Sequence, residues 1–311
     1  MVLLKINKLD YERMKHGELL GKYQNGNYEV RIYEDGTKIR ENDLDFLDAD
    51  FPESMDCKIT NRCPVGCPMC HEKSTPDGKH GDIMNAEFID KLRPGTEMAI
   101  GGGAVTGHPD LIPFLKKLKS IGVIPSITVN QREYKDNFDL VNRLVEEKLI
   151  YGLGVSFISF DDEFWDKVIK NKNVVVHLIA GIHGGDVFDY FTNKGAKILI
   201  LGYKDFGRGH DLLERASAII QLQIDWLKNN LQDLLSKYDV ISFDNLAIEQ
   251  LDVKSVLTDE QWKEFYQGDD GTHTMYVDLV ERQFAKTSTS TERYLLLNNI
   301  DDMFKIIKGG N

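Results

Sequence analysis

The sequence predicts an α/β fold, a partial (β/α)6 TIM barrel with small additions at both ends. Strand-like and helical segments alternate from residue 55 to residue 245, which is typical of right-handed βαβ units around a parallel sheet. The helical segments carry apolar residues three and four apart, as in Leu111, Phe114, Leu115 and Leu118. A chain of 311 residues with 41% hydrophobic residues can bury one large core. We count about six strand–helix units, so the predicted barrel stops short of eight strands.

Residues 1–54 are predicted to form an N-terminal β-hairpin and a linker. Residues 28–33 alternate apolar and polar side chains, Glu34-Asp35-Gly36 supplies a turn, and residues 37–40 return as a second strand. The acidic run 41–50 then reads as a linker. This hairpin would precede the barrel rather than belong to it.

The barrel is predicted over residues 55–245 and a C-terminal extension over residues 246–311. The predicted barrel strands are 55–61, 97–101, 124–130, 151–158, 174–182 and 197–203. A long amphipathic helix (212–237) and a short strand (240–243) follow. The extension is predicted to be α+β and to cap the barrel, with a helix at 259–266, a strand-like segment at 273–287 and a helix at 300–307.

Charge and composition narrow the possible partners. The formal net charge is −12 and the isoelectric point about 5.2, which argues against broad binding to nucleic acid or to anionic membranes. No apolar run approaches the roughly 20 residues that cross a bilayer, and residues 1–10 lack the core of a signal peptide. All four cysteines lie between positions 57 and 70, which suits a metal site in a reducing cytoplasm better than disulfides.

The cysteines Cys63, Cys67 and Cys70 lie on one short loop after the first predicted barrel strand. Thiolates are natural ligands of soft iron, and three of them can hold three corners of a [4Fe–4S] cluster and leave one iron open. The alternative is a structural zinc site that also uses Cys57 or His71. Tetrahedral zinc usually draws on two separated ligand pairs, and no second pair occurs downstream. Cys57, on an apolar strand face, is expected to be a buried small hydrophobe.

Cys63-x3-Cys67-x2-Cys70, placed before a βα array, resembles the signature of the radical S-adenosylmethionine (radical SAM) superfamily. The resemblance covers residues 55–245 and implies that the three cysteines bind a single [4Fe–4S] cluster. It implies that SAM chelates the open iron and is reductively cleaved to a 5′-deoxyadenosyl radical that abstracts hydrogen from a substrate. It also implies an external electron donor such as a flavodoxin or ferredoxin.

Further stretches are similar to SAM-binding segments of that superfamily. Gly101, Gly102 and Gly103 end the second strand and resemble a Gly-Gly-Glu motif, although the acidic residue is missing here. Glycine permits close approach of a ligand to the backbone. The other positions that the resemblance assigns to SAM are Met69, Asn130, Ser156, Ile179, Gly181 and Leu201.

Candidate substrate contacts come from strand alternation and from one loop. Asp56, Lys58 and Thr60 share one face of the first strand, and because the face toward the helices must be apolar, this polar face should point into the barrel. Lys204, Asp205 and Arg208 lie on a glycine-bearing loop after the sixth strand, at the end where (β/α) enzymes carry their active sites. An ordinary solvated turn explains that loop equally well.

The C-terminal segment resembles the end of the SPASM-like accessory domains of peptide-modifying radical SAM enzymes, without their cysteines. This resemblance favours a peptide or protein side chain as the substrate. A nucleoside or another small metabolite is the alternative for the same chemistry. A zinc-stabilised binding module is the alternative of a different class.

Overall fold

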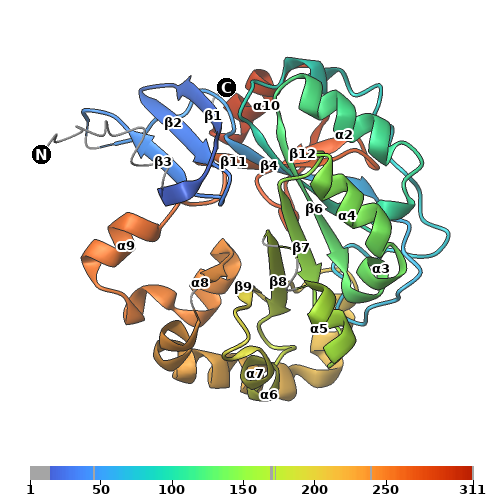
Figure 1. Ribbon diagram of the computed structural model, residues 1–311, viewed down its shortest axis with the longest axis vertical. Coiled ribbons are helices and arrows are strands. Elements are labelled where there is room, and N and C mark those ends of the chain that lie inside the picture. Colours follow the sequence, from blue (N-terminus) through green and yellow to red (C-terminus); the bar gives the residue numbers. More distant parts are fainter. Residues whose placement is uncertain (1–14, 45, 169–170, 172, 239, 310–311) are drawn as a thin grey trace, which may run out of the picture.

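A computed structural model describes residues 15–309 apart from residues 45, 169–170, 172 and 239 (Figure 1). Residues 1–10, for which the sequence predicts no signal peptide, lie outside this part. The strands are β1 (Leu19–Asn25), β2 (Tyr28–Tyr33), β3 (Lys38–Glu41), β4 (Ser54–Thr60), β5 (Glu97–Gly102), β6 (Ile124–Asn130), β7 (Gly152–Ser156), β8 (Val174–Ile179), β9 (Lys197–Leu201), β10 (Val240–Phe243), β11 (Thr274–Asp278), β12 (Gln283–Ala285) and β13 (Tyr294–Leu295).

Helices connect most of these strands. The α-helices are α2 (Leu111–Ser120), α3 (Gln131–Asp136), α4 (Phe138–Glu146), α5 (Asp162–Val168), α6 (Gly185–Phe191), α7 (Arg208–Lys237), α8 (Asn245–Leu251), α9 (Asp259–Phe265) and α10 (Ile300–Ile307). Short 3₁₀ helices are η1 (Glu87–Lys91), η2 (Val105–Gly107) and η3 (Val253–Val256). The long helix α7 contains a kink at Ala216, whose φ and ψ of −136° and 25° are not helical.

The central sheet is large and mostly parallel, which confirms the predicted α/β class. Its strand order is β10-β9-β8-β7-β6-β5-β4-β11-β12-β13, and every ladder from β10 to β11 is parallel. Helices lie between successive strands, as right-handed crossovers require. Within the described residues no ladder joins β10 to β13, so the sheet does not close into a barrel.

Apolar stripes hold the helices against this sheet. All four residues of the stripe predicted for α2 (Leu111, Phe114, Leu115 and Leu118) are buried, and each contributes about 2 kcal/mol through burial. Phe164 and Trp165 of α5 are buried as well. The periodicity of three and four therefore marks the faces that pack on the sheet.

The N-terminal part forms a separate three-stranded sheet of order β1-β2-β3. Its β2 and β3 pair antiparallel, with Glu29 opposite Glu41. The structure adds β1, which pairs antiparallel with β2 and which the alternation of residues 28–40 does not include. Tyr28, Val30 and Ile32 of β2 are buried in the main hydrophobic core, so this small sheet packs on the larger one.

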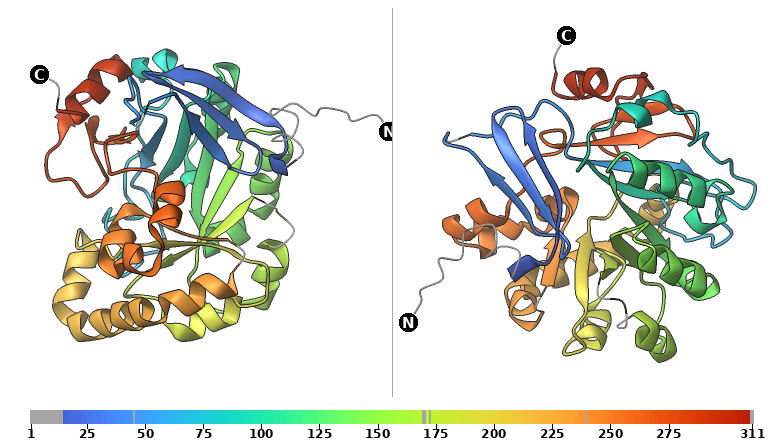
Figure 2. Two further views of the ribbon diagram at one scale, coloured as in Figure 1. Left: turned by 90° about the vertical axis from the view of Figure 1, so that its left-hand side faces the viewer. Right: turned by 45° about the horizontal axis from the view of Figure 1, so that its top comes forward.

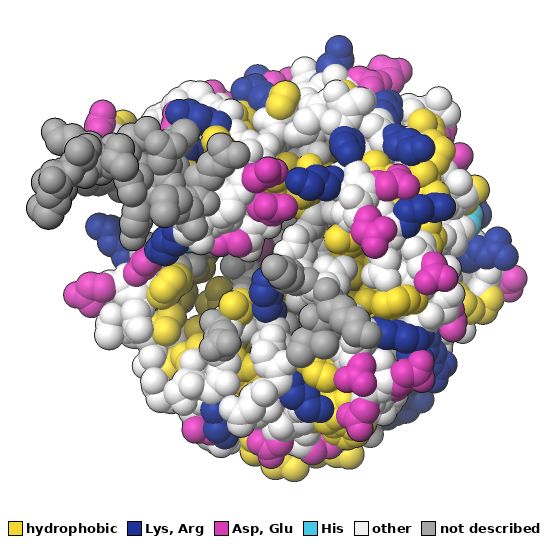
Figure 3. All heavy atoms as spheres, in the orientation of Figure 1, with side chains coloured by type: hydrophobic (Ala, Val, Ile, Leu, Met, Phe, Trp, Pro, Cys, Tyr) yellow, Lys and Arg dark blue, Asp and Glu magenta, His cyan; other side chains and the backbone are white. Residues whose placement is uncertain are grey.

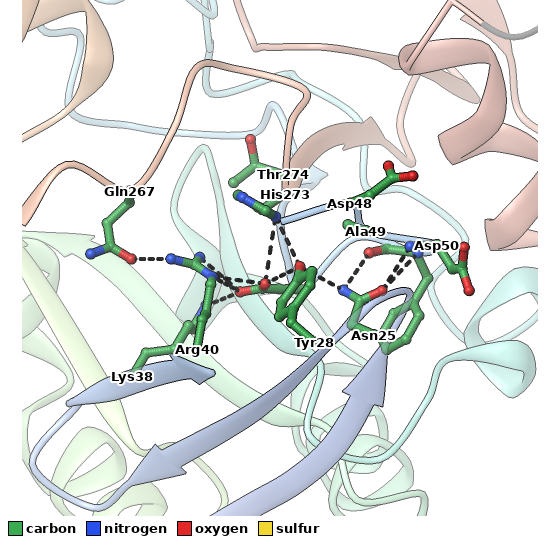
Figure 4. Close-up of polar contacts among 12 residues, drawn as sticks. Asn25, Tyr28, Lys38, Arg40, Asp48, Ala49, Asp50, Gln267, His273 and Thr274 are labelled. Atoms are coloured by element: carbon green, nitrogen blue, oxygen red, sulfur yellow. Dashed lines mark hydrogen bonds and ion pairs between the residues drawn. The ribbon is translucent and has the colours of Figure 1, made fainter. Parts of the chain in front are cut away.

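A buried cluster of polar side chains joins the small sheet to the large one (Figure 4). Glu53, which is 0% exposed, accepts hydrogen bonds from Arg40 Nε and Nη2 at 2.8 Å and from the Tyr28 hydroxyl at 2.5 Å. Lys38 Nζ lies 3.2 Å from the same carboxylate. His273 Nδ1 lies 2.9 Å from the Tyr28 hydroxyl. Side chains that are far apart in the sequence therefore meet at the buried carboxylate of Glu53.

The C-terminal segment extends the main sheet. β11 pairs parallel with β4, and β12 and β13 follow antiparallel. Four apolar residues of α10 (Ile300, Met303, Phe304 and Ile307) are buried against this edge. Helices α7 and α10 lie at opposite ends of the molecule (Figures 1 and 2).

In the part of the chain that the structure describes, no helix combines the length and the apolar character that spanning a membrane requires.

Candidate functional site

A cavity of about 1370 Å³ lies inside the curved sheet and reaches the carboxyl ends of its parallel strands. Side chains from β4 to β10 line it, together with the loop that carries Cys63, Cys67 and Cys70. Figure 3 shows the face of the molecule near α8 hollowed, with acidic and basic side chains interspersed around it. Carboxyl ends of parallel strands are where (β/α) folds place ligands.

Most residues that the sequence analysis selected meet at this cavity. Those that line it are Asp56, Lys58, Cys63, Cys67, Met69, Cys70, Gly101, Gly102, Gly103, Asn130, Ser156, Ile179, Leu201 and Lys204. Four selected residues, Thr60 among them, are not on its wall. Gly181 packs against α7, where an added Cβ would lie 2.8 Å from Ile220 Cγ2. Asp205 pairs with His210 at 2.7 Å among exposed side chains, and Arg208 points into the cysteine loop.

The three cysteine side chains line the cavity and lie within electrostatic reach of one another. Each is partly exposed, and the backbone N–H of Cys70 donates to Cys67 O at 3.3 Å. Burial raises the pKa of the Cys63 and Cys67 thiols, and the neighbouring Cys70 raises both further. A metal ion bound by these sulfur atoms would lower their pKa values again.

The N-terminus of α7 holds the cysteine loop in place. Arg208 Nε donates to Cys67 O at 2.9 Å and Arg208 Nη1 donates to Ser74 O at 2.9 Å. The backbone N–H of Arg208 donates to Cys70 O at 3.0 Å. Gly207 permits this approach, because its φ is +59° and an added Cβ would lie 2.3 Å from His71 O. The expected substrate contact Arg208 is therefore a residue that positions the loop.

We expect Arg208→Ala to loosen the cysteine loop. The change removes two charge-assisted hydrogen bonds and leaves two partly buried carbonyl groups without their donor, a loss of about 2 kcal/mol locally. Arg208→Lys should recover only part of it, because lysine lacks the planar fork. Iron retained per chain after anaerobic reconstitution and gel filtration, and protease cleavage within residues 63–74, measure the effect. Arg215→Ala, on the exposed face of α7, is the control, and equal iron retention in the two variants would contradict this role.

The glycine run divides into one open position and two that pack on the backbone between the end of β4 and Cys63. Nothing lies within 4 Å of a Cβ added at Gly101, so this position faces open space in the cavity. Gly102 has φ +115°, and an added Cβ would lie 2.2 Å from Thr60 O; at Gly103 it would lie 2.3 Å from Arg62 O. The backbone N–H of Gly103 donates to Thr60 O at 2.7 Å. Close packing against the chain itself therefore accounts for two of the three glycines.

Asn130 combines a place on the cavity wall with a structural role. Its side-chain Oδ1 accepts from the backbone N–H groups of Arg132 and Glu133 at 3.0 Å each and so caps α3. The Glu133 carboxylate in turn accepts from the backbone N–H and the hydroxyl of Thr106 at 2.8 Å each. Burial raises the pKa of Glu133 to about 7, although these hydrogen bonds lower it. Helix capping alone is a sufficient reason for asparagine at this position.

Lys58 is engaged by two carboxylates on the cavity wall. Its Nζ lies 2.7 Å from Glu72 Oε2 and 3.0 Å from Asp278 Oδ2, and its side chain is 8% exposed. Glu72 also lies 3.3 Å from His71 Nε2. The cluster links β4, the cysteine loop and β11. Lys58, predicted to contact substrate, therefore neutralises two carboxylates of the protein itself. Thr60, on the same face of the strand, is buried and donates a hydrogen bond to Lys79 O at 3.2 Å. It does not line the cavity.

Among the predicted substrate contacts, Asp56 and Lys204 line the cavity and form no ion pair within the described residues. Burial raises the pKa of Asp56, and Lys204 opposes this rise. Lys204 Nζ donates to Ser288 Oγ at 2.9 Å. Both side chains line the cavity. They could contact a polar substrate group without first breaking an ion pair within the described residues.

His177 lines the cavity and escaped the sequence analysis as a site residue. It lies on β8 beside Gly154 of β7, where an added Cβ would lie 2.3 Å from His177 Cε1. Burial lowers its pKa to about 4, and Lys204 lowers it further, so the ring is neutral at pH 7. The signal was present in the sequence, because His177 interrupts an otherwise apolar strand. Asp244 and Tyr276 also line the cavity, but no feature of the surrounding sequence marks either of them as a cavity residue.

The three thiols on the wall of the cavity are the type of donor that an iron–sulfur cluster takes. Within the described residues, no group of three or more His, Cys, Asp or Glu side chains is arranged to hold a metal ion. The fit of these thiols to such a cluster therefore rests on their chemistry and position: three soft donors on one short loop, partly exposed, on the wall of a large cavity. Cys57 is 1% exposed and packs in the core as predicted.

Fold and site together define an α/β protein with a curved parallel sheet whose cavity is bordered by a three-cysteine loop. The chain is similar in fold to the crystal structure of Streptococcus suis SuiB bound to precursor peptide SuiA. That match has a TM-score of 0.55 and 10% identity and covers 91% of this chain and 86% of that one. SuiB bound to S-adenosylmethionine matches with a TM-score of 0.48 and 12% identity, over 80% of this chain and 62% of that one. No family model matches the sequence, and no curated protein matches it.

Proposed function

We propose that this protein is a radical SAM enzyme that cleaves S-adenosylmethionine reductively at a single [4Fe–4S] cluster and acts on a peptide or protein side chain. The observation that carries the proposal is the loop of Cys63, Cys67 and Cys70, which borders a large cavity at the carboxyl ends of a parallel sheet. The assignment of residues 1–54, 55–245 and 246–311 to an N-terminal addition, the catalytic unit and a C-terminal extension is part of this proposal.

The cluster and SAM, when bound, supply one-electron cleavage of the sulfonium and abstraction of hydrogen from the substrate. The chain's own residues bind, orient and shelter these groups. Cys63, Cys67 and Cys70 are the proposed iron ligands, and Arg208 fixes the backbone that carries them. The open wall at Gly101 leaves room for a ligand close to the backbone. The other cavity residues that we propose to contact SAM are Met69, Asn130, Ser156, Ile179 and Leu201.

Cavity size supports a second ligand beside SAM. Pockets for one small molecule usually measure about 300–1000 Å³, and this cavity measures about 1370 Å³. Asp56 and Lys204 are the polar groups proposed to meet the substrate. The choice of a peptide is supported by the likeness in fold to SuiB, which was crystallised with a precursor peptide.

Anaerobic reconstitution followed by incubation with SAM tests the proposal. We expect a brown protein with close to four irons per chain, which releases methionine and 5′-deoxyadenosine when it is reduced. Peptide pools and nucleoside pools labelled with deuterium are then compared, and deuterium in 5′-deoxyadenosine from the peptide pool supports the proposed substrate. Transfer from nucleosides alone would retain the chemistry and exclude the peptide. Stoichiometric zinc with no iron would instead favour a zinc-stabilised binding module.

A further inference from the structure

Asp56 is a carboxyl group on the cavity wall that lacks a partner in the protein. It is the third residue of β4, and it is exposed to the cavity. It forms no hydrogen bond and no ion pair with the described residues, although burial raises the pKa of its carboxyl group. A carboxylate this deep in a protein is normally paired. The partner that is missing within the described chain can therefore be a group of the bound substrate.

Small side chains beside Asp56 leave room for such a group. In the parallel ladders Asp56 is in register with Ala99 of β5. Ala99 is in register with Ser126 of β6, and Ser126 is in register with Gly152 of β7. These three neighbours line the cavity, and none has a side chain larger than that of serine. On its other side Asp56 is in register with Tyr276 of β11, which also lines the cavity. A slim substrate side chain can thus reach Asp56 along this row of small residues.

Asp56 lies away from the end of β4 that leads into the cysteine loop. Thr60 ends this strand, and at about 3.3 Å per residue Asp56 lies about 13 Å from that end along the strand. A substrate group held at Asp56 therefore leaves the space near the thiols free for another part of the same substrate.

The charged groups that act on Asp56 are one cation and two carboxylates. The Lys204 ammonium lowers the pKa of Asp56, whereas Asp244 and Asp270 raise it. Lys204 Nζ donates a hydrogen bond to Ser288 Oγ at 2.9 Å and forms no ion pair with Asp56. Three carboxyl groups in this region therefore share a single ammonium, and a cation from the substrate would balance their charge better.

Other titratable groups on this wall do not supply the missing charge. Lys58, two positions along β4, is held by Glu72 and Asp278 at 2.7 and 3.0 Å. Burial lowers the pKa of His177 to about 4, so its ring is neutral at pH 7. An ammonium or guanidinium group beside Asp56 would lower the pKa of that carboxyl group and keep it ionised.

We infer that Asp56 determines the specificity of the proposed active site by binding the cationic end of a lysine or arginine side chain of the substrate. The inference rests on the proposed function and names the substrate class of the same site. The cation donates charge-assisted hydrogen bonds to the carboxylate, and its aliphatic arm lies along Ala99 and Ser126. A neutral side chain of the same length would leave Asp56 buried without a partner, which creates the preference.

Calorimetric titration with capped tripeptides that differ only in the central residue tests this inference. The central residue is lysine, arginine, glutamate or norleucine, and norleucine has an unbranched aliphatic arm without charge. Each tripeptide is titrated into the full-length protein, first without iron and then after anaerobic reconstitution with SAM present. The parent is compared with Asp56→Asn, which removes the charge at nearly constant size, and with Asp56→Glu, which retains it. Asp186→Asn is the matched control, because Asp186 lines the same cavity and forms no ion pair with the described residues.

We expect the parent to bind the lysine and arginine tripeptides about tenfold more tightly than the norleucine tripeptide, because only they form charge-assisted hydrogen bonds to Asp56. The glutamate tripeptide should bind most weakly. Asp56→Asn should lose the preference for a cation, while Asp56→Glu and Asp186→Asn should keep it. Equal binding of the lysine and norleucine tripeptides by the parent, or no binding of either, would overturn the inference. Equal losses in Asp56→Asn and Asp186→Asn would overturn it as well. The comparison of tripeptides within the parent does not depend on how the variants fold.

Iron content separates this inference from the proposed function. A chain that binds no iron but prefers the lysine tripeptide through Asp56 would contradict the proposed function and support the recognition of a cation. A chain that cleaves SAM but shows no such preference would retain the chemistry and overturn the role of Asp56. Cadaverine, a free aliphatic diamine, is titrated in parallel, and tighter binding of cadaverine than of the lysine tripeptide would overturn the assignment to a peptide side chain.

Discussion

Cys67→Ala is expected to abolish both iron binding and the cleavage of SAM. The substitution removes the central of three proposed ligands, and two thiolates on one loop cannot hold a cluster of four irons. Cys67 is partly exposed on the cavity wall, and its thiol interacts with those of Cys63 and Cys70. Iron content, visible absorbance after anaerobic reconstitution, and 5′-deoxyadenosine produced per chain measure the result.

Cys57→Ala is the matched control for this experiment. Cys57 is 1% exposed on β4, and burial raises the pKa of its thiol, so it stays protonated. Its replacement should leave the cluster in place and cost only the packing of one sulfur atom, about 1 kcal/mol. A Cys57→Ala variant that folds but holds no iron, or a Cys67→Ala variant that keeps its full iron content, would show that the ligands are assigned wrongly.

Glu53→Gln is expected to lower the free energy of unfolding by about 3 kcal/mol, because it leaves the partly buried Arg40 without its carboxylate partner, whereas Lys38 keeps its ion pair with Glu97. Both cations contact Glu53, which is itself 0% exposed. Urea denaturation followed by circular dichroism measures the change. Glu163→Gln, which removes an exposed partner of Lys167, should scarcely alter the denaturation midpoint. A loss no larger than that of the control would mean that the Glu53 cluster contributes nothing to stability.

The same cluster predicts the pH dependence of stability. Burial alone would raise the pKa of Glu53, but Arg40, Lys38 and Tyr28 outweigh it and lower the pKa from 4.5 to about 2. A carboxyl group whose pKa is depressed on folding stabilises the protein above its unfolded pKa and loses that contribution as pH falls. About 3 kcal/mol should therefore disappear between pH 4.5 and pH 2. The Glu53→Gln variant should lack this portion of the acid destabilisation.

Local sequence features predicted much of the fold correctly, because they depend on neighbours along the chain. The apolar spacing of Leu111, Phe114, Leu115 and Leu118 predicts the face of α2 that is buried. The alternation of polar and apolar residues in β4 predicts that Asp56 lines the cavity. Strand ends were less exact: the strand predicted over residues 151–158 is β7, Gly152–Ser156, although the backbone N–H groups of Tyr151 and Phe157 still donate to the neighbouring strands.

The same local features gave an incomplete account of side-chain roles. Lys58 and Arg208 were predicted as substrate contacts, yet one pairs with Glu72 and Asp278 and the other with the carbonyl groups of the cysteine loop. Gly102 and Gly103 have a packing reason that the motif does not reveal. In each case the partner lies elsewhere in the sequence, and charge or size alone does not identify it.

By itself the sequence determined the α/β class, the helical faces and the place of three thiols after the first parallel strand, because periodicity and spacing are local properties. Only the tertiary structure decided that β11 extends the sheet beside β4, that α7 braces the cysteine loop, and that Glu53 joins the N-terminal sheet to His273. Those arrangements depend on long-range packing, in which a buried charge or an open strand edge is satisfied by whichever distant segment the fold brings to it.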